Sequence, residues 1–286
     1  MILFRAHLKR NKSNNLRISK MKNIIKNTIA ILAVAITFAS CSNSDESISG
    51  IGSLKIEFEN GFAGDALVLG GATLPTSNSE TLKVSTIKYI ISNVVLTNED
   101  GTTFTYPKSE SYFIVDEETP ASLILNLSNI PAGNYTKVKF GIGVDESQFS
   151  LGATGQGDLW TRAQAAGMTW SWASGYKFLA FEGTFSSATC TDVSYMIHTG
   201  KTGTNYNYTT TTLDLPTNAL VRTNITPQIH LSTDLSQIID GTNKINLSSK
   251  NGMGMGVMIM GGTDLPLITS NLPQMFSVEH VHNDPN

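Results

Sequence analysis

The chain is 286 residues long and carries 20 Lys and Arg against 23 Asp and Glu, a net charge of −3. All 23 acidic residues lie after Cys41, whereas eight of the 20 basic residues precede it. The part of the chain from Cys41 onward therefore carries 12 basic and 23 acidic residues, a net charge of −11. A surface this acidic repels phosphate backbones, so we expect no nucleic-acid partner.

The first forty residues have the pattern of a targeting segment. A basic stretch precedes an apolar run at residues 29–38, and two small residues stand before Cys41. These are the parts of a secretory signal, and about ten apolar residues are too few to span a bilayer, which needs roughly 20. The pattern resembles a bacterial lipoprotein signal, which implies a signal region at 1–40 and an acylated Cys41 as the mature N-terminus. An ordinary cleaved signal and an uncleaved anchor are the alternatives.

Three further segments follow from composition. Met21 directly precedes the compact signal, so a start at Met21, with residues 1–20 mis-assigned, is an alternative to Met1. Residues 41–53 are rich in Ser, Gly and acidic residues and predict a flexible tether, which the resemblance to a lipoprotein signal implies is lipidated at Cys41. From Leu54 onward apolar and charged residues alternate, which indicates a half-buried strand. We expect residues 54–286 to form a single β domain.

Short strand-like runs recur along this domain, each bounded by turn residues, and helical periodicity is weak. The runs lie at residues 82–91, 94–97, 112–115, 123–127, 135–144, 178–185, 193–198, 209–215 and 222–231. Short helices are predicted only at 159–167 and 235–240. The pattern predicts an all-β fold, an antiparallel β-sandwich or barrel-like sandwich with few short helices.

Enzyme motifs are missing from the sequence. It contains no Walker loop, dinucleotide fingerprint, HExxH or CxxC pair, and no pair of carboxylates is placed by sequence alone for acid–base work. We therefore expect a protein that is not an enzyme and has no catalytic residues. With Cys41 acylated, Cys190 is left alone. A cysteine in or beside a strand is commonly a small buried hydrophobe, and a reactive thiol or ligand is the alternative.

All three tryptophans fall between residues 160 and 183. Four aromatic residues of this region are at even positions, as residues on one face of a strand would be: Trp170, Trp172, Tyr176 and Phe178. A Ser-Gly pair, however, interrupts any simple strand between them. One interpretation is that these large rings close an end of the sandwich core. The other is that they form a stacking platform for a ligand.

Histidines and methionines are the remaining candidate ligands. His280 and His282 alternate on a strand-like segment, so both imidazoles can face one side. Two ligands seldom make a tight site, and we expect His198, near the aromatic cluster in sequence order, to supply a third. His230 is expected to face solvent from its strand. A Gly-rich run at 253–260 holds four methionines, which are either core residues or thioether ligands for Cu(I).

The order of several fragments resembles a known family. The most specific piece is MTWSWASGYKF at residues 168–178, followed by Glu-Gly at 182–183 and His-Thr-Gly at 198–200. Weaker matching fragments precede it in order at 67–70, 84–96, 112–116, 130–135 and 140–145. Together they are similar to the MbnP-like family of secreted and periplasmic copper-binding proteins.

This resemblance implies a β-rich copper-binding protein whose members in many bacteria are lipoproteins. It implies that a tryptophan, Trp170 or Trp172, forms part of the site and is oxidised to kynurenine by a di-haem peroxidase-like partner. It also makes His198 a candidate copper ligand.

Two functional hypotheses follow. The leading one is a lipoprotein anchored in the cell envelope, at the outer membrane or the periplasmic face, that binds copper through His198, His280 and His282. The alternative is a cell-surface carbohydrate- or peptide-binding β-sandwich that uses the tryptophan cluster.

Overall fold

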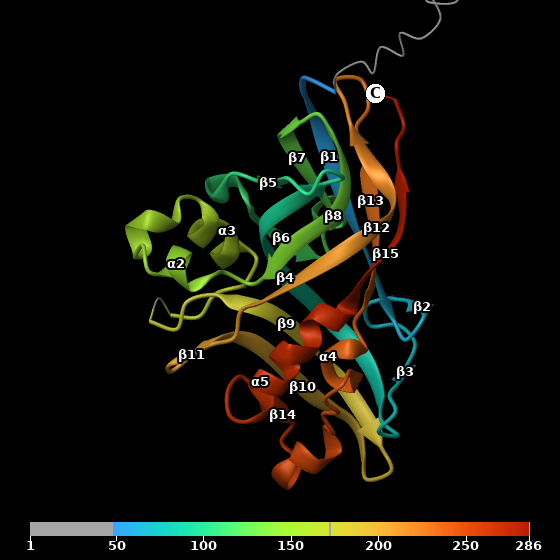
Figure 1. Cartoon of the computed structure of the whole chain (residues 1–286). Coiled ribbons are helices and arrows are strands. Elements are labelled where there is room, and N and C mark those ends of the chain that lie inside the picture. The colour runs from blue at the N-terminus through green and yellow to red at the C-terminus, as the bar shows by residue number, and fades with distance from the viewer. Residues whose placement is uncertain (1–47, 172, 286) are drawn as a thin grey trace, which may run out of the picture. The chain divides into compact units, whose positions relative to one another are not determined.

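The structure, a computed structural model, describes residues 48–171 and 173–285. The described part forms one compact unit built from two sheets, and strands dominate it (Figure 1). The predicted all-β fold with few short helices is confirmed. Cys41, the signal and most of the tether lie outside the described residues. In the described part of the chain, no helix is long and apolar enough to cross a membrane.

The smaller sheet has the strand order β15-β13-β1-β2, and β7 also pairs with β1. Its strands are β1 (Ile51–Phe62), β2 (Asp65–Ala66), β7 (Ile124–Pro131), β13 (Gln228–Asp234) and β15 (Phe276–His282). The first strand begins three residues before Leu54, because Ile51 and Gly52 already pair with β7. The β1–β13 pair is parallel and the other pairs of this sheet are antiparallel.

The larger sheet follows the order β11-β10-β9-β4-β8-β12, and β14, β3, β5 and β6 pair along it. Its strands are β3 (Leu74–Pro75), β4 (Thr81–Asn98), β5 (Thr103–Thr105), β6 (Tyr112–Asp116), β8 (Gly133–Ile142), β9 (Lys177–Ser187), β10 (Cys190–Thr202), β11 (Asn205–Tyr206), β12 (Thr209–Val221) and β14 (Val257–Ile259). Only the β10–β14 pair is parallel among those described for this sheet.

The central strand β4 is longer than the sequence pattern predicted. Residues 82–91 and 94–97 were expected as two strands, but they form one. Asn93 adopts a φ of 50°, and the pairing with β8 shifts register between Ser92 and Val95. Asn tolerates this conformation better than most residues, so the strand bends at a bulge and continues. The Asp100-Gly101 turn then leads into β5, where Thr97 pairs with Thr103.

Helices are few and short. They are α2 (Glu146–Phe149), α3 (Leu159–Ala165), α4 (Gln237–Asp240) and α5 (Asp264–Asn271). The 3-10 helices are η1 (Lys108–Glu110), η2 (Pro120–Leu123), η3 (Ala153–Gln156), η4 (Ser248–Lys250), η5 (Gly252–Gly254) and η6 (Leu272–Met275). Thus α3 and α4 lie within the two predicted helical segments, whereas the sequence pattern did not indicate α2 or α5.

An aromatic cluster joins the two sheets. Phe58 and Phe276 come from β1 and β15 of the smaller sheet, and Tyr89 and Phe140 come from β4 and β8 of the larger one. The ring of Phe58 lies 5.9 Å from each of the other three rings in edge-to-face geometry. Edge-to-face contacts at such distances are favourable beyond the apolar area that they bury.

A second apolar cluster forms around the α2–η3–α3 segment, which lies between β8 and β9 in the chain. The α2–η3–α3 segment packs Leu159 and Ala163 against Tyr112 of β6 and Ala180 of β9. This cluster is separate from the core between the sheets. The helical segment therefore covers part of the larger sheet on the face away from the smaller one.

Replacing Phe58 by Ala tests the aromatic cluster. We expect a loss of about 3–5 kcal/mol in the free energy of unfolding, because a fully buried ring leaves a cavity between two sheets. Urea unfolding followed by circular dichroism measures it. The control Leu151→Ala removes a side chain that is 59% exposed and should change stability by no more than about 0.5 kcal/mol. A loss below about 1 kcal/mol for Phe58→Ala would show that the sheets do not depend on this ring.

Candidate metal centre

His198 lies on the face of the larger sheet that points away from the smaller one. On β10 its neighbours Tyr195 and Ile197 belong to the core between the sheets, so residues 196 and 198 point the other way. In register, His198 pairs with Ala180 of β9, which belongs to the cluster under the helical segment. The imidazole is therefore enclosed, and only 4% of the residue is exposed.

Glu182 of β9 holds one ring nitrogen of His198. The distance from His198 Nε2 to Glu182 Oε1 is 2.6 Å. Burial lowers the pKa of His198, an effect that the hydrogen bond to Glu182 opposes and the charge of Lys177 reinforces. The imidazole is thus neutral at pH 7, and Nε2–H donates to Glu182. Nδ1 then carries the lone pair, and it has no hydrogen-bond partner within the described part of the chain.

Trp170 lies against this imidazole. The two ring centroids are 6.1 Å apart. Trp170 stands in a loop that is closed by a β-bridge between Thr169 and Tyr176. The two ends of this loop are anchored, because Met168 and Tyr176 are buried in the second cluster. A Cβ on Gly200 would come within 2.7 Å of Trp170 Cζ3, so the glycine is what allows the ring to approach β10.

Methionines occupy the same face beside His198. Met258 of β14 pairs in register with Met196 of β10, which pairs with Glu182 of β9. Val257 and Ile259 belong to the core between the sheets, so Met258 points outward with Met196 and is 66% exposed. Met260 follows β14 and lines, with Trp170, a hollow of about 380 Å³. The sequence left open whether these methionines are core residues or ligands, and Met258 is not a core residue.

The tryptophans separate rather than stack. Trp160 of α3 packs edge-on against Tyr176, with centroids 5.1 Å apart, whereas Trp170 contacts His198. Trp172 lies outside the described residues. Each described tryptophan ring thus packs against a different neighbour, and this arrangement gives the carbohydrate-platform hypothesis no specific support.

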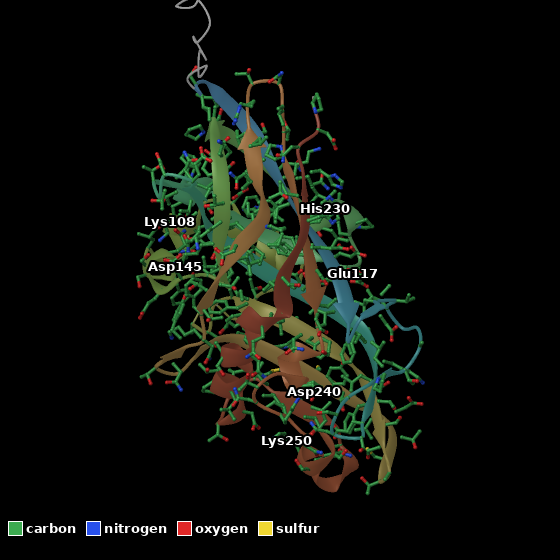
Figure 2. The ribbon with its side chains drawn as sticks, turned by 45° about the vertical axis from the view of Figure 1, so that its right-hand side comes forward. Lys108, Glu117, Asp145, His230, Asp240 and Lys250 are labelled. Atoms are coloured by element: carbon green, nitrogen blue, oxygen red, sulfur yellow. The ribbon has the colours of Figure 1, made fainter. Side chains whose placement is uncertain are left out.

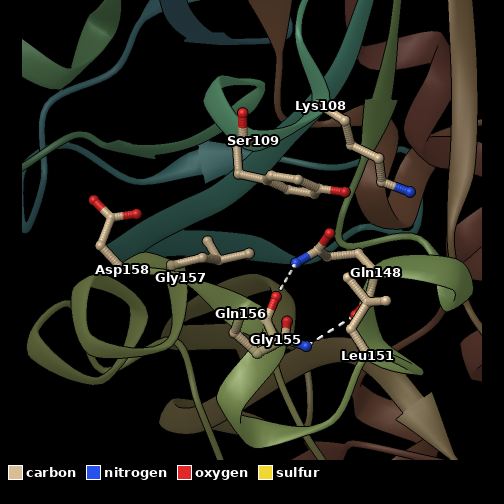
Figure 3. A pocket seen from close by; sticks show the side chains of 10 residues that line it. Lys108, Ser109, Gln148, Leu151, Gly155, Gln156, Gly157 and Asp158 are labelled. Atoms are coloured by element: carbon tan, nitrogen blue, oxygen red, sulfur yellow. Dashed lines mark hydrogen bonds between the residues drawn. The ribbon is translucent and has the colours of Figure 1, made fainter.

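A second hollow lies between η1 and the helical segment (Figure 3). Its volume is about 340 Å³, and Lys108, Tyr112, Gln148 and Gln156 are among the residues that line it. The Gln148 side chain donates to the Gly155 carbonyl, and Gln156 donates to the Gln148 carbonyl. These amides hold the loop together, and we assign the hollow no chemistry.

His280 and His282 do not join His198. They lie on β15 of the smaller sheet, where His280 pairs in register with His230 of β13. The expected third partner, His198, is on β10 of the larger sheet. His230, which the strand pattern placed in solvent, is the residue beside them. Sequence spacing showed the alternation of His280 and His282, but the pairing of β13 with β15 joins segments about fifty residues apart and left no local signal.

One comparison with known proteins identifies a family. The MbnP family model matches residues 51–259. A solved structure, MbnP from Methylosinus trichosporium, is similar with 13% sequence identity and a TM-score of 0.45, covering 75% of this chain and 82% of that chain. A search of curated proteins finds no match.

The protonation of His198 can be tested in the metal-free protein. We expect its imidazole to titrate below the ordinary value of about 6.5, because burial opposes the charged form. Glu182→Gln should lower the midpoint further, because the hydrogen bond to the carboxylate favours imidazolium. Ring ¹⁵N NMR across a pH series measures both. Titration above 6.5, or a rise in Glu182→Gln, would contradict the assignment.

Proposed function

This chain belongs to the MbnP family, and on that premise we propose that it is a copper-binding protein of the cell envelope and not an enzyme. The observation that carries the proposal is the enclosed Nδ1 of His198, which has no partner in the described residues. Leaving a buried acceptor unpaired costs about 1–3 kcal/mol. A copper ion bound at Nδ1 would satisfy it, while Glu182 fixes the ring from the other side, as carboxylates do behind metal-bound histidines.

The donor set around His198 suits copper in its reduced state. Met196 and Met258 stand side by side on the same face, and Met260 lies near Trp170. Thioethers are soft ligands that select Cu(I), and imidazole binds copper in either state. No ligand in this set is charged, so the protein would hold Cu(I) without the carboxylates that harder cations prefer.

Trp170 is one of the two tryptophans that the family resemblance connects to the site, and within the described residues it is the one that lies against His198. It touches His198 and lines the same hollow as Met260. We include in the proposal that Trp170 is the residue oxidised by a di-haem peroxidase-like partner. The position of Trp170 in a loop, and not in a strand, supports this, because a loop at the surface is open to a protein partner.

Copper(I) affinity tests the site. We expect His198→Ala and the double variant Met196→Leu/Met258→Leu each to weaken Cu(I) binding by about 10-fold or more, since even indirect contacts to a metal are worth 10–100-fold. Titration against a chromogenic Cu(I) chelator measures it.

Two matched controls accompany this titration. Met255→Leu removes a thioether that is 76% exposed and outside the paired row, and it should change nothing. His280→Ala/His282→Ala should also retain Cu(I) affinity. Unchanged affinity in both test variants would remove His198 and the methionines from the copper site.

Lipid anchoring is tested at Cys41. The apolar run and small residues before it predict that Cys41→Ala leaves the protein unprocessed or releases it from the membrane fraction. Membrane fractionation and intact mass of protein from the native host report the lipid. Peptide mass mapping of the same sample reports kynurenine at Trp170, which has gained one oxygen and lost one carbon relative to tryptophan. Normal fractionation and mass in Cys41→Ala would refute the anchor, and an unmodified Trp170 in the native protein would refute its oxidation.

A further inference from the structure

A bulge in β15 places two imidazoles on the outside of the smaller sheet. Leu231 pairs with Val278 but His230 pairs with His280, so Glu279 is an extra residue in β15. Val278 and Val281 both pack against the core. They can do so only because the bulge reverses the alternation between them. His280 and His282 therefore face outward together.

His230 faces the same way from the next strand. Its neighbours Ile229 and Leu231 are buried in the core, so the imidazole points to the outer surface of β13 (Figure 2). The rings of His230 and His280 stack with centroids 4.3 Å apart, and His282 stands edge-on to both. One ring nitrogen from each histidine lies within 4.8 Å of the others.

Glu57 orients His230 within this cluster. On β1 it pairs in register with His230, and its Oε2 lies 2.9 Å from His230 Nδ1. Gln228 also donates to Oε2, at 2.5 Å, which keeps the carboxylate in place. With Nδ1–H directed to Glu57, the lone pair of His230 is on Nε2, the nitrogen free to bind an ion.

We propose that His230, His280 and His282 form a second metal site, which binds a divalent first-row cation and is separate from the His198 site. Nitrogen ligands lie about 2.0–2.1 Å from such a cation, so nitrogens a few ångströms apart surround it with small adjustments of exposed side chains. His280 Nε2 and His282 Nε2 are already 3.0 Å apart, a hydrogen-bond distance that a bound ion would replace.

The donor set distinguishes this site from the first. It offers three imidazoles, one from each of its histidines. Imidazole suits Cu(II), Ni(II) and Zn(II), among which affinity is highest for Cu(II). Glu57 beside His230 and Glu279, whose Oε2 is 3.8 Å from His280 Nδ1, add negative charge that favours a dication. His280 and His282 also lie beyond residues 51–259, the part matched by the family model.

Titration of the full-length protein with Zn(II), and with Cu(II) followed by electron paramagnetic resonance, tests the site. We expect His230→Gln and His280→Gln/His282→Gln to weaken Zn(II) binding by about 10-fold or more. Both variants should also reduce the nitrogen hyperfine splitting of the Cu(II) spectrum, because fewer imidazoles remain to bind the ion. His198→Gln separates the two sites and should leave the Zn(II) affinity unchanged. Unchanged Zn(II) affinity in both cluster variants would overturn the inference and leave the His198 proposal standing. Equal loss in His198→Gln would also overturn it, because the sites would then not be separate.

Glu57 supplies a second measurement that does not remove a ligand. In metal-free protein, ring ¹⁵N NMR should show His230 with its proton on Nδ1, and Glu57→Ala should abolish that preference and weaken Zn(II) binding. Glu57→Gln retains an oxygen acceptor, so its Zn(II) affinity should lie between those of the wild type and Glu57→Ala. Glu279→Gln, which alters a carboxylate outside hydrogen-bond range of His280, is the control for the tautomer alone and should leave the His230 proton on Nδ1. A His230 proton on Nε2 in the wild type would contradict the proposed geometry.

Discussion

Both candidate sites depend on the contact between the two sheets at Phe58, Tyr89, Phe140 and Phe276. These rings come from four strands and close around one another at centroid distances of 5.1–6.0 Å. Phe276 is the first residue of β15, so the cluster anchors the strand that carries His280 and His282. Tyr89 lies on β4, whose partner β9 carries Glu182. Without this apolar contact, neither sheet would hold its outer face in a defined position, because a sheet needs its inner face buried to be stable.

The two faces obtain their ligands by different means. On the larger sheet, the helical segment and its apolar cluster cover the outer face and hold Trp170 over His198, so that imidazole is enclosed. On the smaller sheet nothing comparable is described over the three histidines, and His282 is exposed. An enclosed imidazole beside uncharged thioethers suits a soft ion, whereas an open imidazole cluster suits a cation that exchanges with solvent. The difference in cover is a physical reason to propose two kinds of site on one fold.

In both candidate sites a glutamate carboxylate lies within hydrogen-bond distance of the histidine nitrogen that would not bind the ion. Glu182 holds Nε2 of His198, and Glu57 holds Nδ1 of His230. In each case the carboxylate lies on a strand beside the histidine's strand, so strand register sets which ring nitrogen stays free. The free atom is Nδ1 at His198 and Nε2 at His230. Neither glutamate could be selected from sequence, because a carboxylate in an alternating strand looks the same whether it faces water or a histidine.

The sequence by itself determined the class of fold and the family. Alternation of apolar and polar residues identified most strands, since period 2 is local to each segment, and the fragments around Trp170 and His198 carried the resemblance that the family model confirms. Tertiary structure decided which ligands meet. Only the β13–β15 pairing joins His230 to His280, only the bulge at Glu279 turns two imidazoles outward, and only the β14–β10 pairing aligns Met258 with Met196. These are contacts between distant segments, and they arise from burial of apolar faces that no local pattern encodes.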